Sequence, residues 1–239
     1  MPFEPRDRRD RLIVALDVPG LPEAEALLDR LAGVVSTFKV GAQLFTAAGP
    51  AAVELVRKRG GRVFLDLKYH DIPAQVAGAV GEAARLGVSM LTVHAAGGRE
   101  MLRAAAGAAA GAGRDRPRVL AVTVLTSLDR AALQRDLQVP LAVEGHVVHL
   151  AGLAREAGCD GAVASPQEAR RLRATMGPDW LIVTPGIRPA GAEAGDQARV
   201  ATAAAARKAG ADYVVVGRPI TGAPDPLRAA EAILQELGA

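Results

Sequence analysis

Residues 63–75 read VFLDLKYHDIPAQ, an apolar run that ends in two carboxylates, an ammonium and an imidazole. Side chains two apart in a strand project from the same face, so Asp66 and Lys68 are expected to point together while Leu67 points away. The pattern predicts a strand whose carboxyl end carries opposite charges on one face. An isolated pair of this kind is often a structural salt bridge, so its interpretation depends on the rest of the chain.

Short apolar strands alternate with Ala/Leu-rich helical stretches along the whole chain. Strands are expected over 12–17, 35–40, 62–67, 89–94, 118–124, 160–164, 181–184 and 212–216. Helices are expected over 22–31, 50–60, 74–86, 100–112, 144–157, 166–176, 197–209 and 225–237. Eight such units predict an α/β fold, a single (β/α)8 TIM barrel over residues 1–239 with a polar N-terminal extension over 1–11. Two longer connections interrupt the alternation: 127–143, which has room for a short helix of its own, and 186–196.

The composition narrows the class of function. A net charge of +3 combined with only 3% aromatic residues leaves few stacking surfaces for nucleic acid and favours small anionic molecules as partners. The single cysteine, Cys159, excludes an intramolecular disulfide, and we expect a buried apolar role for it in a cytoplasmic protein. The first eleven residues are polar and charged, and the apolar run 12–16 is too short for a membrane span or a secretory signal, so no membrane partner is expected.

Ionisable side chains end the first four expected strands: Asp17, Lys39, Asp66 with Lys68, and His94. The carboxyl ends of barrel strands converge at one mouth, so these groups should meet there. Each has a structural explanation when taken alone, such as a helix cap for Asp17 or a core histidine for His94. Their occurrence on four successive strands instead predicts an active site.

Lysine is rare in this arginine-rich chain and occurs only at positions 39, 58, 68 and 208. Positions 58 and 208 lie at expected helix ends, where a solvated cation suits the helix dipole. Lys39 and Lys68 lie at strand ends. A lysine ammonium can readily give up a proton, whereas an arginine guanidinium retains its proton. These two lysines are therefore candidates for proton-transfer chemistry.

Glycine and arginine follow the seventh and eighth expected strands, as Gly186 with Arg188 and as Gly217 with Arg218. Glycine lets backbone N–H groups approach an anion, and the guanidinium offers paired donors to phosphate oxygens. The loops after strands seven and eight of such barrels frequently bind phosphate. The sequence therefore predicts a phosphate site on the side of the mouth opposite the lysines.

With these motifs in order, the chain resembles the orotidine 5′-phosphate decarboxylase family, in its short bacterial-type class. The resemblance runs from Leu12 to near the C-terminus. It is carried by ALD at 15–17, FKVG at 38–41, DLKYHDIP at 66–73, VHA at 93–95, LTS at 125–127, TPGIR at 184–188, DQ at 196–197 and VGRP at 216–219. It implies decarboxylation of orotidine 5′-monophosphate to UMP in de novo pyrimidine biosynthesis, with no metal and no other cofactor.

The resemblance also implies roles for individual residues. Lys68 would protonate C6 of the pyrimidine, Asp66 would lie beside the departing carboxylate, and Lys39 would hydrogen-bond Asp66 and the ribose. Asp71 and Ile72 would enter the site of the neighbouring subunit, which implies a homodimer. The implied substrate-binding residues are Asp17, Ile72, Gln75, Thr126, Ser127, Pro185, Arg188, Gln197, Gly217 and Arg218.

One departure and two alternatives accompany this interpretation. Ala74-Gln75 stands where the family usually has Asn-Thr, so a hydroxyl contact across the interface is missing, and the Gln75 amide is its candidate replacement. Mg²⁺-dependent sugar-phosphate decarboxylases and hexulose-phosphate synthases share a D-x-K-x-x-D element, but Ile72-Pro73 and the 184–188 motif fit the orotidylate enzyme better. A non-catalytic nucleotide-binding barrel is the second alternative, and the desolvation cost of a buried Lys-Asp-Lys array counts against it.

Overall fold

The computed structural model describes residues 8–189 and 200–238, in which eight strands close into a parallel barrel in chain order. The strands are β1 (Leu12–Ala15), β2 (Thr37–Gly41), β3 (Arg62–Tyr69), β4 (Met90–His94), β5 (Arg118–Val122), β6 (Gly161–Val163), β7 (Leu181–Thr184) and β8 (Tyr213–Val216). β8 pairs with β1 in parallel and so closes the barrel. The predicted α/β barrel is confirmed.

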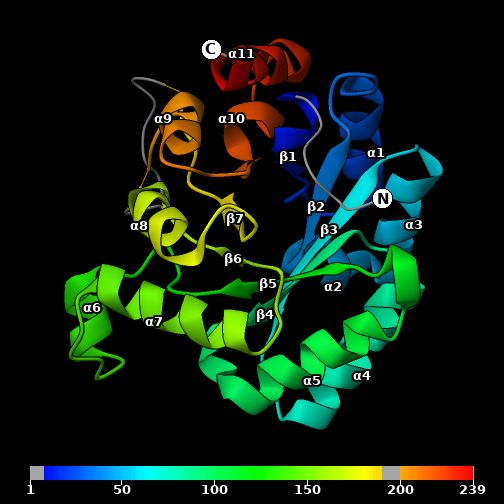
Figure 1. Ribbon diagram of the computed structural model, residues 1–239. Helices are drawn as coiled ribbons and strands as arrows, with labels where there is room; N and C mark the ends of the chain where they lie inside the picture. The colour runs from blue at the N-terminus through cyan, green and yellow to red at the C-terminus, as the bar shows by residue number, and fades with distance from the viewer. Residues whose placement is uncertain (1–7, 190–199, 239) are drawn as a thin grey trace.

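Helices follow the strands and surround the barrel, as Figure 1 shows. The α-helices are α1 (Leu21–Arg30), α2 (Ala42–Ala48), α3 (Pro50–Lys58), α4 (Pro73–Arg85), α5 (Gly98–Ala110), α6 (Arg130–Arg135), α7 (Val143–Glu156), α8 (Pro166–Met176), α9 (Ala203–Lys208), α10 (Arg218–Thr221) and α11 (Pro226–Gly238). Three 3-10 helices are η1 (Arg8–Arg11), η2 (Ala95–Gly97) and η3 (Gly113–Asp115). The connection 127–143 contains α6, which is the short helix for which that segment has room.

The expected bounds were wrong at one α-helix, and two short α-helices were not predicted. The helix expected from residue 197 begins only at Ala203, because Ala201 forms a β-bridge with Ile187 and Thr202 caps the helix by accepting the Ala205 N–H. Residues 197–199 lie outside the described part of the chain. The unpredicted helices α2 and α10 follow β2 and β8 directly, which leaves no loop for sequence patterns to detect.

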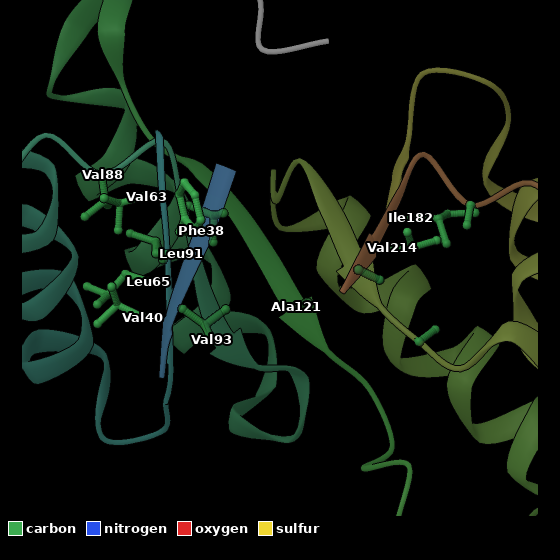
Figure 2. Packing of buried hydrophobic residues seen from close by; sticks show 14 of the residues in the cluster. Phe38, Val40, Val63, Leu65, Val88, Leu91, Val93, Ala121, Ile182 and Val214 are labelled. Atoms are coloured by element: carbon green, nitrogen blue, oxygen red, sulfur yellow. The ribbon is translucent and has the colours of Figure 1, made fainter. Parts of the chain in front are cut away.

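Two apolar layers hold the barrel together because alternate strand residues point in opposite directions. Outward residues such as Val40, Leu65 and Leu91 pack in the cluster that the helices cover (Figure 2). Inward residues form a second cluster made of Ile13, Ala15, Phe64, Met90, Leu120, Val183, Tyr213 and Val215. This inner cluster fills the interior of the barrel below its mouth at the carboxyl ends of the strands.

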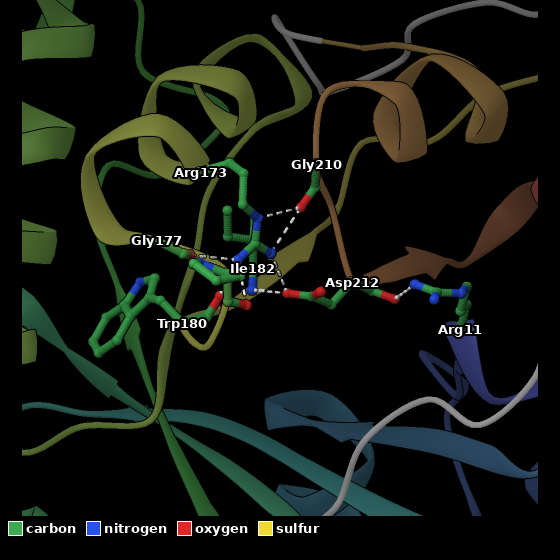
Figure 3. Close-up of polar contacts among 8 residues, drawn as sticks. Arg11, Arg173, Gly177, Trp180, Ile182, Gly210 and Asp212 are labelled. Atoms are coloured by element: carbon green, nitrogen blue, oxygen red, sulfur yellow. Dashed lines mark hydrogen bonds and ion pairs between the residues drawn. The ribbon is translucent and has the colours of Figure 1, made fainter.

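Two largely buried aspartates tie neighbouring strands together at the amino end of the barrel. Asp212, just before β8, accepts the backbone N–H of Ile182 on β7 at 2.8 Å and a 2.6 Å hydrogen bond from Arg173 Nη2 (Figure 3). Asp160, just before β6, accepts the N–H of Val119 on β5 at 2.9 Å. These contacts lie at the end of the strands opposite the mouth, where they serve stability.

The remaining expectations concern Cys159, membrane-spanning helices, the N-terminal extension and the number of domains. Cys159 is buried and free, as expected. Over residues 8–189 and 200–238, no helix is long and apolar enough to cross a membrane. The part of the polar extension that is described forms η1, and Asp10 within it contacts Arg62 at the start of β3. The assignment of residues 1–239 to one domain stays a prediction.

Candidate active site

A cavity of about 470 Å³ lies at the carboxyl ends of the strands. Nine of the predicted site residues line it: Asp17, Lys39, Asp66, Lys68, Thr126, Pro185, Arg188, Gly217 and Arg218. Its apolar floor comes from inward residues of the barrel, including Phe64, Val163 and Val215. The prediction that polar residues at the strand ends meet at one mouth is therefore confirmed for β1 to β3 and for β7 and β8.

Alternating carboxylates and ammonium groups form a continuous array on one side of the cavity. Lys39 Nζ lies 2.8 Å from Asp17 Oδ1 and 3.7 Å from Asp66 Oδ2. Lys68 Nζ lies 2.9 Å from the same Asp66 Oδ2. The Asp66 side chain is 13% exposed and that of Lys68 is 38% exposed. The Asp66 carboxylate thus faces the ammonium groups of both Lys39 and Lys68. Of these two lysines, Lys68 is the more accessible to a ligand.

The Lys68 backbone departs from the regular strand that the sequence predicted. β3 and β4 pair in register up to Leu65 and Leu91, but the next pair is Tyr69 with Val93, so four residues of β3 advance as far as two of β4. Lys68 lies within this bulge at φ +52°, a left-handed conformation that residues other than glycine rarely adopt. Bulges re-aim side chains next to active sites. The bulge, rather than plain alternation, determines where the Lys68 ammonium lies.

The electrostatics of Asp66 are dominated by its neighbours. Burial alone would raise the pKa of its carboxyl, but the charges of Lys39 and Lys68, with hydrogen bonds from Lys68 and Thr92, hold the pKa below its ordinary value. Asp66 is therefore an ionised carboxylate at neutral pH, and it supplies the negative charge that holds both ammonium groups.

The opposite side of the cavity is cationic. Arg188 follows β7, and Arg218 begins α10 directly after Gly217. Among the described residues, four cationic side chains and two carboxylates line the cavity, an excess of two positive charges. Such a surface attracts an anionic ligand, and guanidinium groups bind phosphate with paired hydrogen bonds.

Four of the predicted residues lie elsewhere on the described surface. Asp71, Ile72, Gln75 and Ser127 are exposed and do not line the cavity of their own chain. The Asp71 carboxylate accepts the N–H of Ile72 at 2.6 Å, and Ile72 is 64% exposed. Gln197, and Asp196 beside it in the resemblance motif, lie outside the described residues.

His94 ends β4 but also does not line the cavity, contrary to the prediction that it joins the other strand ends. Its ring stacks on His70 with centroids 5.1 Å apart. Burial, together with the charges of His70 and Lys68, lowers its pKa. His94 is therefore a neutral packing partner of His70 near neutral pH.

Within the described residues, no cluster of three or more His, Cys, Asp or Glu side chains is arranged to hold a metal ion.

Comparison with known proteins shows which family carries this arrangement of barrel and charged cavity. Residues 10–233 match the orotidine 5′-phosphate decarboxylase / HUMPS family. The chain belongs to this family.

Relatives named orotidine 5′-phosphate decarboxylase match over nearly their whole length. The protein of Moorella thermoacetica is 58% identical over 233 residues, which cover 96% of this chain and 92% of that protein. The protein of Gloeothece citriformis is 52% identical, with 95% of this chain and 97% of that protein covered. Among solved structures, orotidine 5′-phosphate decarboxylase from Lactobacillus acidophilus is 38% identical with a TM-score of 0.84, and the alignment covers 95% of this chain and 99% of that one. The predicted resemblance to the orotidine 5′-phosphate decarboxylase family is confirmed.

Within this family fold, the structure adds cavity residues that the sequence did not indicate. Gln43 at the start of α2 and Thr221 at the end of α10 both line the cavity. They lie on the two helices that were not predicted, so no pattern placed them at the mouth. Thr92, which touches both Asp66 and Lys68, was also missed. Strand alternation could have found Thr92, because it lies two residues before His94 on the inward face of β4.

Proposed function

We propose that the chain decarboxylates orotidine 5′-monophosphate to UMP in pyrimidine biosynthesis, with Lys68 as the proton donor. Membership of the family and the consistent naming of relatives at 50–58% identity support the reaction. The observation that carries the residue assignment is the array in which Lys68 and Lys39 share the Asp66 carboxylate at 2.9 Å and 3.7 Å.

The array suits the electronic demand of this reaction. When the bond between C6 and the carboxylate breaks, CO2 leaves and the electron pair stays on C6. The Lys68 ammonium stabilises that negative charge, and its proton forms the new C6–H bond, after which the neutral amine regains a proton from water. Asp66 keeps the ammonium in place before the substrate arrives, so little reorganisation is needed during the reaction.

The charge on the cavity wall matches the rest of the substrate. Arg188, Gly217 and Arg218 bind the phosphate, together with Gln197, and Asp17 and Lys39 bind the ribose hydroxyls. Thr126 contacts the pyrimidine and Pro185 borders it, and both residues line the cavity. Ser127, the neighbour of Thr126, is exposed outside the cavity lining, and its contact with the pyrimidine stays a prediction from the resemblance. Binding the phosphate far from C6 can lower the barrier at C6 because binding energy from a remote group can be used to position the reacting part.

The proposal includes a homodimer in which Asp71 and Ile72 complete the site of the other subunit, with Gln75 at the same interface. Two features support it: the three side chains are exposed outside their own cavity, and Ile72 presents a large apolar surface to solvent. Loops after barrel strands commonly carry such functional residues. We also place the enzyme in the cytoplasm, where a single buried thiol is the ordinary condition.

The decisive assay follows the ultraviolet absorbance of orotidine 5′-monophosphate with purified protein in EDTA. We expect conversion to UMP by the wild type and by Lys58→Ala, a control at an exposed lysine of α3, and loss of conversion by Lys68→Ala. Conversion that needs added Mg²⁺, or turnover of a hexulose phosphate instead, would refute the proposed reaction. Tight UMP binding without any turnover would indicate a binding protein.

Subunit mixing tests the shared site. A hybrid of Lys68→Ala and Asp71→Ala subunits contains one site with both residues intact if Asp71 acts in its neighbour, and no intact site if it acts in its own chain. We therefore expect two inactive variants to regain activity when they are unfolded and refolded together. No regain, in a mixture shown to contain hybrid dimers, would contradict the shared site.

A further inference from the structure

Thr92 lies on β4 with no exposed surface, beneath the cavity and outside its lining residues. Its side chain shares the inward face of β4 with Met90, two residues earlier, which belongs to the inner cluster. A buried hydroxyl in an otherwise apolar layer is costly unless both its donor and its acceptor capacity are used. Thr92 uses both, and both partners belong to the catalytic strand β3.

We propose that Thr92 is a positioning residue for the decarboxylation: its one hydroxyl fixes the rotation of the Asp66 carboxylate and the bulge that carries Lys68. The hydroxyl donates to Asp66 Oδ1 at 3.0 Å, and its oxygen accepts the backbone N–H of Lys68 at 2.9 Å. This inference rests on the proposed function and adds a residue that touches neither the substrate nor the cavity.

The first bond determines which carboxylate oxygen faces which partner. With Oδ1 held by Thr92, Oδ2 is the oxygen that receives the Lys68 ammonium at 2.9 Å and lies 3.7 Å from the Lys39 ammonium. Without the Thr92 hydroxyl, the Asp66 carboxylate can rotate about its bond to Cβ. Lys39 and Lys68 could then contact different oxygens of the carboxylate instead of sharing Oδ2. The position of the Lys68 proton relative to C6 would then vary.

The second bond holds the Lys68 backbone where it is least favoured. A lysine at φ +52° persists only where the surrounding structure supports that conformation. β3 and β4 pair normally on either side of the bulge, at Leu65 and at Tyr69, so Thr92 supplies the link between the strands within it. Loss of this link would let Lys68 relax toward a regular strand and move its ammonium.

The test compares Thr92→Val, which replaces the hydroxyl by a methyl of similar size, with Thr92→Ser, which keeps the hydroxyl. We expect Thr92→Val to lose about 10- to 100-fold in kcat with little change in KM, since displacements of about 1 Å can cost about 100-fold. The acid limb of its kcat/KM profile should move to higher pH, because Asp66 loses a hydrogen bond while the charges facing it from Lys39 and Lys68 remain. Thr92→Ser should restore most of kcat.

The matched control is Thr184→Val on β7. Thr184 is equally buried, and its Oγ1 finds no hydrogen-bond partner in the described part of the chain. We expect Thr184→Val to retain wild-type kcat. If Thr92→Val does not fold, Thr92→Ser and Thr92→Ala, which both lack the methyl and differ only in the hydroxyl, replace it in the comparison.

The outcomes separate this inference from the proposed function. A wild type that converts no orotidine 5′-monophosphate refutes the proposed function. An active wild type combined with a folded Thr92→Val of unchanged kcat, an unmoved acid limb, or a Thr92→Ser no better than Thr92→Ala overturns the inference alone.

Discussion

Gly41 leaves the space that the Lys39 ammonium occupies. A Cβ built on Gly41 would lie 2.7 Å from Lys39 Nζ and 2.9 Å from Asp17 Oδ1, closer than real Cβ atoms approach other heavy atoms. The Gly41 backbone is extended, with φ −94° and ψ −178°, a conformation open to any residue. Glycine is therefore needed here for room rather than for backbone freedom, and the Lys39–Asp17 pair depends on it.

Gly41→Ala should accordingly displace the Lys39 ammonium and disturb the array. We expect a fall in kcat of about 10- to 100-fold, from a displacement of up to about 1 Å, with the barrel still folded. Steady-state kinetics and circular dichroism measure the two effects. The control is Gly145→Ala on α7, where a Cβ meets nothing within 4 Å. Wild-type kcat in a folded Gly41→Ala would show that the array tolerates the displacement.

Arg218→Ala should weaken both substrate binding and turnover. Loss of one or two hydrogen bonds to a charged phosphate costs about 1.5–3 kcal/mol each, so we expect kcat/KM to fall by at least about tenfold. With orotidine, which lacks the phosphate, the variant and the wild type should react equally slowly. The exposed Arg228→Ala on α11 serves as the control. An equal loss on both substrates would contradict a phosphate-binding role.

Asp160→Asn should destabilise the fold without changing kcat. The Asp160 carboxylate, 8% exposed, accepts hydrogen bonds from Arg116, Arg118 and the Val119 backbone at the end of the barrel opposite the cavity. Removal of its charge should lower the free energy of unfolding by about 2–3 kcal/mol, measured by urea denaturation. The exposed Asp136→Asn should leave stability nearly unchanged. A fall in the kcat of the folded variant would contradict a purely structural role for Asp160.

Stability should also fall in acid, and Asp160→Asn should reduce that dependence. Burial alone would raise the pKa of Asp160, but hydrogen bonds from Arg116, Val119 and Arg118 hold it below its ordinary value, as the lysines do for Asp66. Below about pH 4 the unfolded chain therefore binds protons that the native state does not, so the free energy of unfolding decreases as pH falls. Urea midpoints at pH 6 and pH 3.5 measure the slope. Equal slopes for the wild type and Asp160→Asn would contradict this account.

Much of the fold follows from local patterns that need no long-range information. The apolar strand runs and the helices between them specify the barrel, since neighbouring parallel strands need a helical crossover. Residues at strand ends, such as Asp17, Lys39 and Asp66, were predictable because a closed parallel barrel brings all carboxyl ends to one mouth. His94 was predicted there on the same grounds, but packing against His70 keeps it out of the cavity lining.

The sequence by itself determined the barrel, the family and the charged residues at the mouth, because strand periodicity and specific motifs are properties of short segments. Only the tertiary structure decided the bulge at Lys68, the link through Thr92 and the space at Gly41. Each of these depends on the register of one strand against its neighbour and on distances between side chains far apart in the sequence. The bulge interrupts the regular pairing of β3 with β4, and the contacts of Thr92 and Gly41 form only once neighbouring strands are paired, so the pattern of a single segment does not predict them.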